Sequence, residues 1–237
     1  MKRNLLFHLY AKKQTMWPWH VEKLIQYSKA WNGRRIAIVV MDDWTEDEET
    51  IRRALAPLGM EVLIRRNDPE FGETKHFIET LGLLKSLDPQ EATFYCHSKG
   101  VSRDGPLIPA ITMWCRAMYA LCLDRPELIE KLLQTAQAAG AFRVRIPHSG
   151  STWCYAGTFF WLKHSTLFSK EKWTEIAGGK WGVEGYPGLH LKFDDTVAMN
   201  RDVVEPRWLP DWLYGRNGSG VTEGHLKVWM DELWRMG

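Results

Sequence analysis

The sequence predicts an α/β fold in which a mostly parallel central sheet is flanked by helices on both faces. In the first half of the chain, short apolar runs alternate four times with segments of helical spacing, and the connections between them are short. Such alternation is typical of strand–helix–strand units, whose strands pair in parallel. The run over residues 35–41 is almost continuously apolar, as strands buried on both faces of a parallel sheet are.

The elements of this first half are placed by the apolar runs and by helix boundary residues. Pro18 suits the first turn of a helix, and Asn32-Gly33 suits its end. Thr45 with Glu48 matches a capping box, and Gly59 is expected to end the helix that this box begins. Strands are therefore expected over residues 5–10, 35–41, 60–64 and 93–96, with helices between them over residues 18–31, 45–58 and 74–87.

The second half has a different pattern. A long helical stretch is expected to break near Pro126, and further strands are expected over residues 142–146 and within 153–162, the latter antiparallel or mixed. From Glu171 onward the chain is rich in Trp, Gly and Pro and weakly periodic, which we interpret as a ligand-covering lobe closed by a helix over residues 222–235. No repeat or low-complexity linker divides the 237 residues, so one domain is expected.

Composition and charge exclude several classes of protein. The net charge of +2 gives no sign of the concentrated basic face that nucleic-acid-binding proteins carry. No stretch approaches the length of a membrane span, and the apolar run at residues 5–7 is too short for a signal peptide. The four cysteines lack zinc spacing, and Cys115 and Cys122 are expected in the core. We expect a cytoplasmic protein, either free or peripheral at the inner membrane face.

The most informative stretch is the end of the strand predicted over residues 93–96. There the chain turns abruptly polar, at His97-Ser98-Lys99-Gly100. Open α/β sheets bind ligands beyond the carboxyl ends of their strands, a lysine there supplies positive charge, and a glycine allows close approach of the backbone. We therefore expect His97, Lys99 and Gly100 to bind the diphosphate of a nucleotide sugar. Residues 1–104 would then form a nucleotide-binding half and residues 105–237 an acceptor half.

Several local strings support the same interpretation. They are residues 77–81 (FIETL), 94–102 (FYCHSKGVS), 114–118 (WCRAM), 148–150 (HSG), 157–161 (GTFFW) and 183–187 (VEGYP). With these strings, residues 5–200 resemble a bacterial group of GT-A-type glycosyltransferase-like proteins. The resemblance implies a nucleotide-diphospho-sugar fold, a UDP- or GDP-linked sugar donor, and a glycan or lipid-linked acceptor, as in polysaccharide biosynthesis.

One departure from the GT-A pattern concerns the metal. GT-A enzymes carry Asp-x-Asp at the end of the fourth strand to hold a divalent ion, and this position here reads His97-Ser98-Lys99. The charge that develops on the leaving diphosphate still needs stabilisation. We expect Lys99, together with a protonated His97, to supply it without a required cofactor, and the alternative is Mn²⁺ or Mg²⁺ held by carboxylates elsewhere.

Carboxylates supply the other candidate functional groups. Asp42 and Asp43 follow the second strand, where they either accept hydrogen bonds from ribose hydroxyls or form a turn before a helix. Glu184 lies among apolar rings that favour a raised pKa, so it is either the general base for an acceptor hydroxyl or a solvated loop residue. The resemblance also places an acidic residue of the acceptor region here. Asp195, next to Asp194, is the competing base, part of a metal pair or a helix cap.

Aromatic and histidine side chains complete the predicted site. Core and interface packing accounts for most of the 13 tryptophans, but an indole ring also stacks well on a sugar face, so a few of them are expected to contact a ligand. Trp153, Trp161 and Trp181 are candidate sugar platforms, of which Trp161 suits the core best, and Tyr186 is also expected to contact sugar or acceptor. His148 is either part of the donor pocket or structural, and the backbone at residues 8–10 either lines the base pocket or simply ends a strand.

Two other functions remain as alternatives. His97-x-Lys99-x4-Asp104 matches the H-x-K-x4-D pattern of phospholipase D-like phosphodiesterases, but His190 and His225 begin H-x-K strings without the required aspartate. The missing Asp-x-Asp favours a non-catalytic nucleotide-sugar or carbohydrate-binding module on a degenerate GT-A fold. Turnover of a nucleotide sugar would exclude that module.

Overall fold

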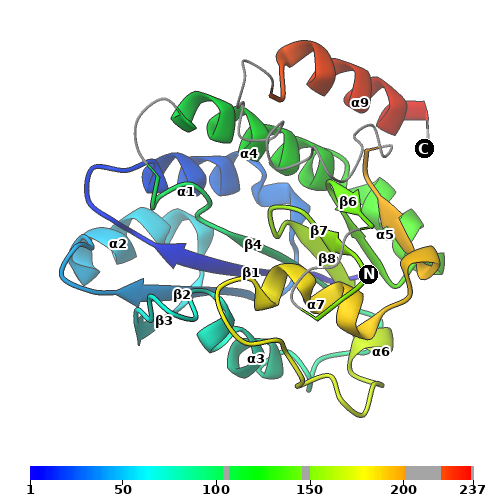
Figure 1. Cartoon of the computed structure of the whole chain (residues 1–237), viewed down its shortest axis with the longest axis horizontal. Coiled ribbons are helices and arrows are strands. Elements are labelled where there is room, and N and C mark those ends of the chain that lie inside the picture. Colours follow the sequence, from blue (N-terminus) through cyan, green and yellow to red (C-terminus); the bar gives the residue numbers. More distant parts are fainter. Residues whose placement is uncertain (104–106, 146–149, 201–219, 236–237) are drawn as a thin grey trace.

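The computed structural model describes residues 1–103, 107–145, 150–200 and 220–235, and in them a seven-stranded sheet forms the centre (Figure 1). Its strands lie in the order β3-β2-β1-β4-β8-β5-β9. Strands β1 to β4 pair in parallel, β8 runs antiparallel to both β4 and β5, and β9 is parallel to β5. The strands are β1 Arg3–Tyr10, β2 Arg35–Met41, β3 Glu61–Arg66, β4 Ala92–His97, β5 Ala138–Gly140, β8 Phe160–Lys163 and β9 Thr196–Ala198. The expected mostly parallel α/β fold is confirmed.

Helices cover both faces of this sheet. Figure 1 shows α1, α4 and α9 on one side, and α3 and α7 on the other. Short 3-10 turns over Ser28–Ala30, Ala56–Leu58 and Phe193–Asp195 join some of the elements. The α-helices are α1 Trp17–Gln26, α2 Glu48–Leu55, α3 Thr74–Gly82, α4 Ile108–Leu123, α5 Pro126–Thr135, α6 His164–Leu167, α7 Gly182–His190 and α9 Glu223–Arg235.

Side-chain alternation along the strands produces an apolar core on each face of the sheet. In β1, Leu5, Phe7 and Leu9 pack into one cluster, while Leu6 points into the other. Neighbouring side chains of a strand point to opposite faces, so a strand that is apolar throughout must be covered on both sides. The pattern that predicted buried strands therefore also explains the two helical layers.

The structure differs from the expected elements at several boundaries. The helix after β2 is capped by Asp47, whose carboxylate accepts a hydrogen bond from the Thr50 amide at 2.9 Å. The predicted capping box is wrong, because the Thr45 hydroxyl donates instead to the Asp42 carbonyl at 2.7 Å. Helix α3 ends at Gly82, earlier than expected.

The second half departs further from the prediction. The expected strand over residues 142–146 is represented by β6 (Arg143–Val144), which pairs with β7 (Cys154–Tyr155) outside the main sheet. The expected strand within 153–162 is divided into β7 and β8 by a turn in which Gly157 and Thr158 both have positive φ. Residue 146 and the predicted boundary between residues 104 and 105 lie outside the described residues.

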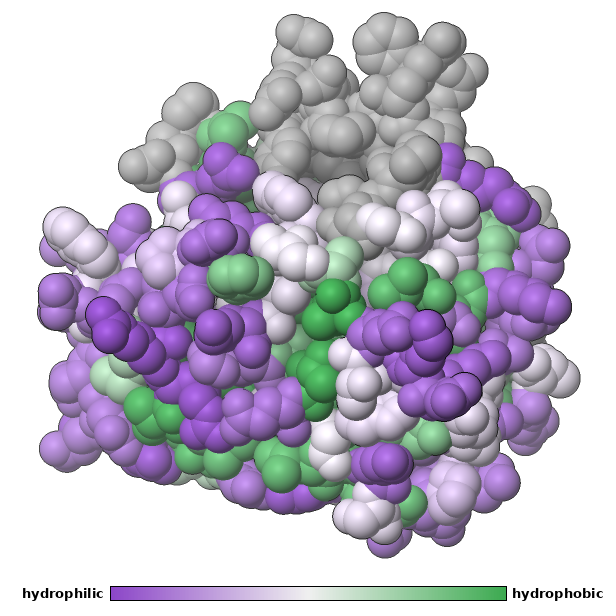
Figure 2. Space-filling view, turned by 60° about the horizontal axis from the view of Figure 1, so that its bottom comes forward, coloured by the Kyte–Doolittle hydropathy of each residue, from purple (hydrophilic) through white to green (hydrophobic). Residues whose placement is uncertain are grey.

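The surface, the lengths of the helices and the state of the cysteines can be compared with what the composition predicted. Figure 2 shows a face on which hydrophilic residues predominate, with apolar residues in small groups near its middle. Across the described ranges, no helix combines the length and the apolar character that crossing a membrane requires. All four cysteines are buried and free of disulfides, as expected for core residues such as Cys115 and Cys122.

Candidate functional site

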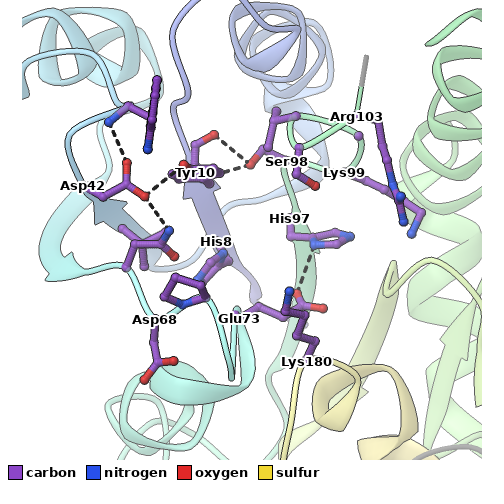
Figure 3. A pocket seen from close by; sticks show the side chains of 18 of the residues that line it. His8, Tyr10, Asp42, Asp68, Glu73, His97, Ser98, Lys99, Arg103 and Lys180 are labelled. Atoms are coloured by element: carbon purple, nitrogen blue, oxygen red, sulfur yellow. Dashed lines mark hydrogen bonds and ion pairs between the residues drawn. The ribbon is translucent and has the colours of Figure 1, made fainter. Parts of the chain in front are cut away.

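A pocket of about 760 Å³ opens at the carboxyl ends of strands β1 to β4 (Figure 3). Parallel strands deliver the residues that follow them to one edge of a sheet, which is why four separate segments meet here. The residues just before α3 and just before α7 close the pocket. Its lining comprises His8, Tyr10, Val40, residues 42–44, 67–69, 72–73 and 97–103, Lys180 and Trp181.

One side of the pocket is built around the Asp42 carboxylate. It accepts hydrogen bonds from the Tyr10 hydroxyl at 2.9 Å, the Asn67 amide at 2.7 Å and the Trp44 backbone N–H at 2.9 Å. Burial, the largest single influence, would raise the pKa of Asp42, but these hydrogen bonds outweigh it and lower the pKa. Asp42 is therefore a fixed anion, and Asp43 lies exposed beside it in the lining.

The other side of the pocket carries positive charge. Lys99, Arg103 and Lys180 all line it. The Lys99 ammonium lies 4.3 Å from the ring centroid of Trp114, a cation–π contact that orients the lysine. The Asp42 side and the cationic side face each other across the pocket (Figure 3).

The turn that carries Lys99 is fixed from two directions. The Ser98 hydroxyl accepts a hydrogen bond from the Tyr10 amide at 2.9 Å, which ties the turn to β1. His20 is 2.9 Å from the Lys99 carbonyl through Nε2 and 3.0 Å from the Tyr119 hydroxyl through Nδ1. Because burial lowers the pKa of His20 to about 4, its ring is neutral, and Nε2 donates to the carbonyl while Nδ1 accepts from Tyr119.

Gly100 is required by both the backbone and the packing of this turn. Its φ is +89°, a region that L-residues rarely adopt. A Cβ atom at this position would lie 2.6 Å from Cγ2 of Ile111 on α4. Residue 100 must therefore be glycine, because any side chain there would prevent the turn from packing directly on α4.

Glu73 lies in the pocket wall and is only 8% exposed. Its carboxylate accepts a hydrogen bond from the Tyr95 hydroxyl at 2.8 Å and lies 3.2 Å from Nδ1 of His97. Burial raises the pKa of Glu73 to about 7 and Glu184 adds to the rise, while Tyr95, Lys99 and Thr158 oppose it. This pocket therefore contains a carboxyl group that gains and loses a proton near neutral pH.

His97 is placed as predicted but not charged as predicted. Burial, followed by the positive charge of Lys99, lowers the pKa of His97 well below its ordinary value. The protonated His97 expected from the sequence is therefore corrected to a neutral imidazole. Burial also lowers the pKa of His8, in the same lining, to about 3.

The predicted aromatic contacts divide between pocket and core. Trp181 lines the pocket and is 50% exposed, in keeping with a sugar platform. Trp153 is buried and its indole N–H donates to the Leu191 carbonyl, so it offers no accessible face. Tyr186 is also buried and donates to the Trp173 carbonyl, which corrects both assignments. Trp161 is a core residue, as expected.

The two predicted bases, Glu184 and Asp195, are held by hydrogen bonds behind the pocket surface. Glu184 is in the first turn of α7, where its carboxylate accepts a hydrogen bond from the Gly157 amide at 2.8 Å. The Asp195 carboxylate accepts a hydrogen bond from Gln137 at 3.1 Å, beside β9. Neither is among the residues that line the pocket. His148 lies outside the described residues.

Sequence reasoning missed several lining residues. Asn67 and Asp68 follow β3, and the strand-end rule applied to Asp42 would have found them. Glu73, Arg103 and Lys180 come from irregular stretches without a comparable signal. Helix α7 itself was also missed, since it contains three glycines and a proline. One of these glycines, Gly182, is needed for α7 to pack against α3, because a Cβ at this position would lie 2.7 Å from Thr74.

The donor set of the pocket does not match a divalent metal site. In the described residues, no three His, Cys, Asp or Glu side chains are grouped so as to hold a metal ion. Lys99, Arg103 and Lys180 line the pocket together with its carboxylates, and their positive charge disfavours a divalent cation there.

Known proteins show only distant likenesses to this chain. No protein-family model matches the chain. No curated protein matches its sequence. A 4-diphosphocytidyl-2C-methyl-D-erythritol synthase structure is 12% identical with a TM-score of 0.43, over 90% of this chain and 99% of that one. A glucosyl-3-phosphoglycerate synthase from Mycobacterium tuberculosis, in complex with Mn²⁺, UDP and glucosyl-3-phosphoglycerate, is 13% identical with a TM-score of 0.46, over 90% and 76%. At these identities and TM-scores, neither likeness bears on what this chain does.

Proposed function

We propose that the protein is a glycosyltransferase that moves a sugar from a nucleotide-diphospho-sugar to a hydroxyl group of a glycan or lipid-linked acceptor. The observation that supports this most is that one pocket holds the Asp42 carboxylate on one side and Lys99 and Arg103 on the other (Figure 3). A nucleotide sugar has the matching division, with hydroxyl-bearing rings at its ends and a diphosphate between them. Carboxylates accept hydrogen bonds from hydroxyls, and ammonium and guanidinium groups bind phosphate oxygens.

Each side of the pocket has a role in this proposal. Asp42, with Asp43 beside it, accepts hydrogen bonds from the nucleoside. Lys99 binds the diphosphate and stabilises the charge that develops as it leaves, while Gly100 lets the backbone approach. Trp181 stacks on a sugar ring at the rim. We propose that Lys99, rather than a divalent ion, carries the charge of the diphosphate, since it lines the pocket at the turn after β4.

The runner-up is a non-catalytic module that binds nucleotide sugars. The replacement of Asp-x-Asp by His97-Ser98-Lys99 is the observation that favours it. Release of nucleoside diphosphate from a donor would exclude it, whereas saturable binding without turnover would support it. The phosphodiesterase alternative needs a second H-x-K string in the site, and neither His190 nor His225 lines the pocket, while Asp104 lies outside the described residues.

The first experiment measures thermal stability with UDP, GDP, CMP and common sugar nucleotides, each with EDTA and with Mn²⁺. A ligand that binds only the folded chain raises its Tm by mass action. We expect one nucleoside diphosphate to stabilise the protein equally in EDTA. Stabilisation only with Mn²⁺ would retain the transferase and refute metal independence. No shift with any nucleotide would contradict the diphosphate site.

Lys99→Met then tests the role of the cationic side. A charge-assisted hydrogen bond contributes about 1.5–3 kcal/mol, so the Kd of the stabilising nucleotide should rise by about 10- to 100-fold. Calorimetric titration measures this change. Lys29→Met, at an exposed lysine outside the pocket lining, is the matched control and should leave the Kd unchanged. An unchanged Kd in Lys99→Met would remove Lys99 from the site.

A further inference from the structure

Four carboxylates line the pocket, and they differ in their burial and in their hydrogen bonds. Asp42 is a weak base because three hydrogen bonds hold it as an anion. Asp68 accepts hydrogen bonds from the backbone of Phe71 and Glu70, which lower its pKa. Asp43 lies exposed at the rim. Glu73 alone among these four is buried in the wall.

The elements around Glu73 hold its carboxylate in one place. Tyr95, on β4, donates to it, and His97, two residues further on the same strand face, lies 3.2 Å away. A further hydrogen bond comes from the side chain of Thr158, in the turn before β8, and Thr158 adopts a φ of +65° although it is not glycine. Strained backbone of this kind persists where the surrounding structure fixes it, and it clusters at active sites.

Glu73 also lies where a reaction with the proposed donor would need it. Glu73 and Lys99 line the same pocket, and the positive charge of Lys99 favours the ionised form of the Glu73 carboxyl group. The half-exposed Trp181 lines the same pocket as Glu73, so a sugar stacked on Trp181 would share the pocket with this carboxyl group.

We propose that Glu73 is the general base that deprotonates the acceptor hydroxyl, held in position by Tyr95 and His97. The inference rests on the proposed transferase function and assigns its base to a residue other than Glu184. In this step the Glu73 carboxylate takes the hydroxyl proton and the acceptor oxygen bonds to the anomeric carbon. The bond from that carbon to the diphosphate oxygen breaks, and its electron pair leaves with the diphosphate beside Lys99. A direct displacement of this kind inverts the anomeric configuration.

The test compares the wild type with Glu73→Gln, and it uses water as the acceptor so that no acceptor need be known. UDP-glucose, UDP-N-acetylglucosamine and GDP-mannose are the probes, and the release of UDP or GDP is measured. Loss of a general base costs about 10²–10⁴-fold in rate, so we expect turnover by Glu73→Gln to fall at least about 100-fold with the Kd for UDP or GDP unchanged. Glu79→Gln, the same change on the exposed face of α3, is the matched control and should turn over normally.

The outcomes separate this inference from the proposed function. If the wild type releases no nucleoside diphosphate from any probe, both are overturned. If the wild type turns over and Glu73→Gln does so equally, only the base assignment is overturned. The same holds if Glu73→Gln loses donor affinity instead of rate, or if Glu184→Gln alone abolishes turnover. Proton NMR of the released sugar shows which anomer forms first, and retention would contradict the direct displacement.

A second measurement remains decisive if Glu73→Gln does not fold. In the described residues, the ionisable groups that interact with Glu73 are Tyr95 and His97 from β4, Lys99 from the turn and Glu184 from α7. Lys180, just before α7, lines the same pocket and adds a further positive charge to it. The hydrogen bond from Tyr95 favours the ionised carboxylate, so Tyr95→Phe should move the acid limb of the pH–rate profile to higher pH. A merely structural role of Tyr95 would lower the rate at every pH and leave the limb in place, which would contradict the proposal.

Discussion

Glu73 shows how a single residue is adapted to its pocket at a cost in stability. Its carboxyl group is buried, and burial raises its pKa from 4.5 to about 7. Below the unfolded-state value the group is protonated in both states and contributes nothing. As the pH rises from there to the folded-state value, the unfolded chain ionises first, so stability is lost over this window and the loss is complete above it.

This pKa shift predicts a pH-dependent effect of Glu73→Gln on stability. The shift corresponds to about 3 kcal/mol at about 1.4 kcal/mol per pKa unit, so the free energy of unfolding of the wild type should fall by about that much relative to Glu73→Gln between about pH 4 and pH 8. Urea unfolding at the two pH values measures it. Glu79→Gln should show the opposite sign, since the hydrogen bond from Arg65 lowers the pKa of Glu79. A difference that is independent of pH would contradict the raised pKa.

The candidate site was predictable where a residue type and its place on a strand were enough. Lys99 and Asp42 both follow apolar strands, and the carboxyl-end rule brings them into one pocket. Glu73 could not be found in this way, because its character comes from burial against Tyr95 and α7, which lie far from it in the sequence. Trp153 and Tyr186 were misassigned since an aromatic side chain suits a sugar face and a core equally well.

At the scale of elements, the turn between β4 and α4 depends on Gly100. Gly59 provides a matched comparison, since its φ is +58° and a Cβ there would meet nothing within 4 Å. Gly59→Ala should therefore cost only the backbone strain, about 1–2 kcal/mol. Gly100→Ala adds the clash with Ile111 and should cost a further 1–3 kcal/mol, roughly, and weaken binding of the nucleotide.

Urea unfolding of the two glycine variants, with calorimetric titration of the nucleotide, checks this prediction. The slope of the unfolding free energy against urea should be the same for both variants, so that the midpoints compare directly. Equal losses of stability in the two variants would show that α4 shifts to accommodate a methyl group at residue 100 without further cost. The close packing of the turn would then not be what fixes Lys99.

Elements with strong periodicity were predicted well, and those held by tertiary packing were not. Strand β2 matches its predicted range, since a continuous apolar run is typical of a buried strand. Strand β5 is Ala138–Gly140, three small residues that carry no strand preference of their own. Helix α7 contains Pro187 and three glycines, so its stability comes from its buried residues rather than its helix propensity.

For the whole molecule, the burial of all four cysteines predicts a direct test of the core. Cys96, Cys115, Cys122 and Cys154 are buried, and burial raises the pKa of each thiol. Because the thiolate is the reactive form, the folded protein should not react with Ellman's reagent, whereas the urea-unfolded chain should release four equivalents. Rapid reaction of any thiol in the folded protein would contradict this packing.

The fold class could be predicted from the sequence, but the order of strands in the sheet could not. Alternating strands and helices imply parallel neighbours, and β1 to β4 follow that rule. The position of β8 between β4 and β5 is a pairing between segments distant in sequence, and no local pattern specifies it. That insertion also brings the turn at Gly157 and Thr158 beside Glu73, which makes the sheet order part of the site.

The insertion of β8 has a consequence for a chain emerging from the ribosome. Strands β1 to β4 are complete once residue 97 has been made, yet β8 begins only at residue 160. Until then the outer side of β4 presents unpaired backbone groups to any neighbouring chain, and such an open strand invites association between nascent polypeptides. Strand β4, which carries the turn with Lys99, therefore gains β8 as its second neighbouring strand only late in synthesis.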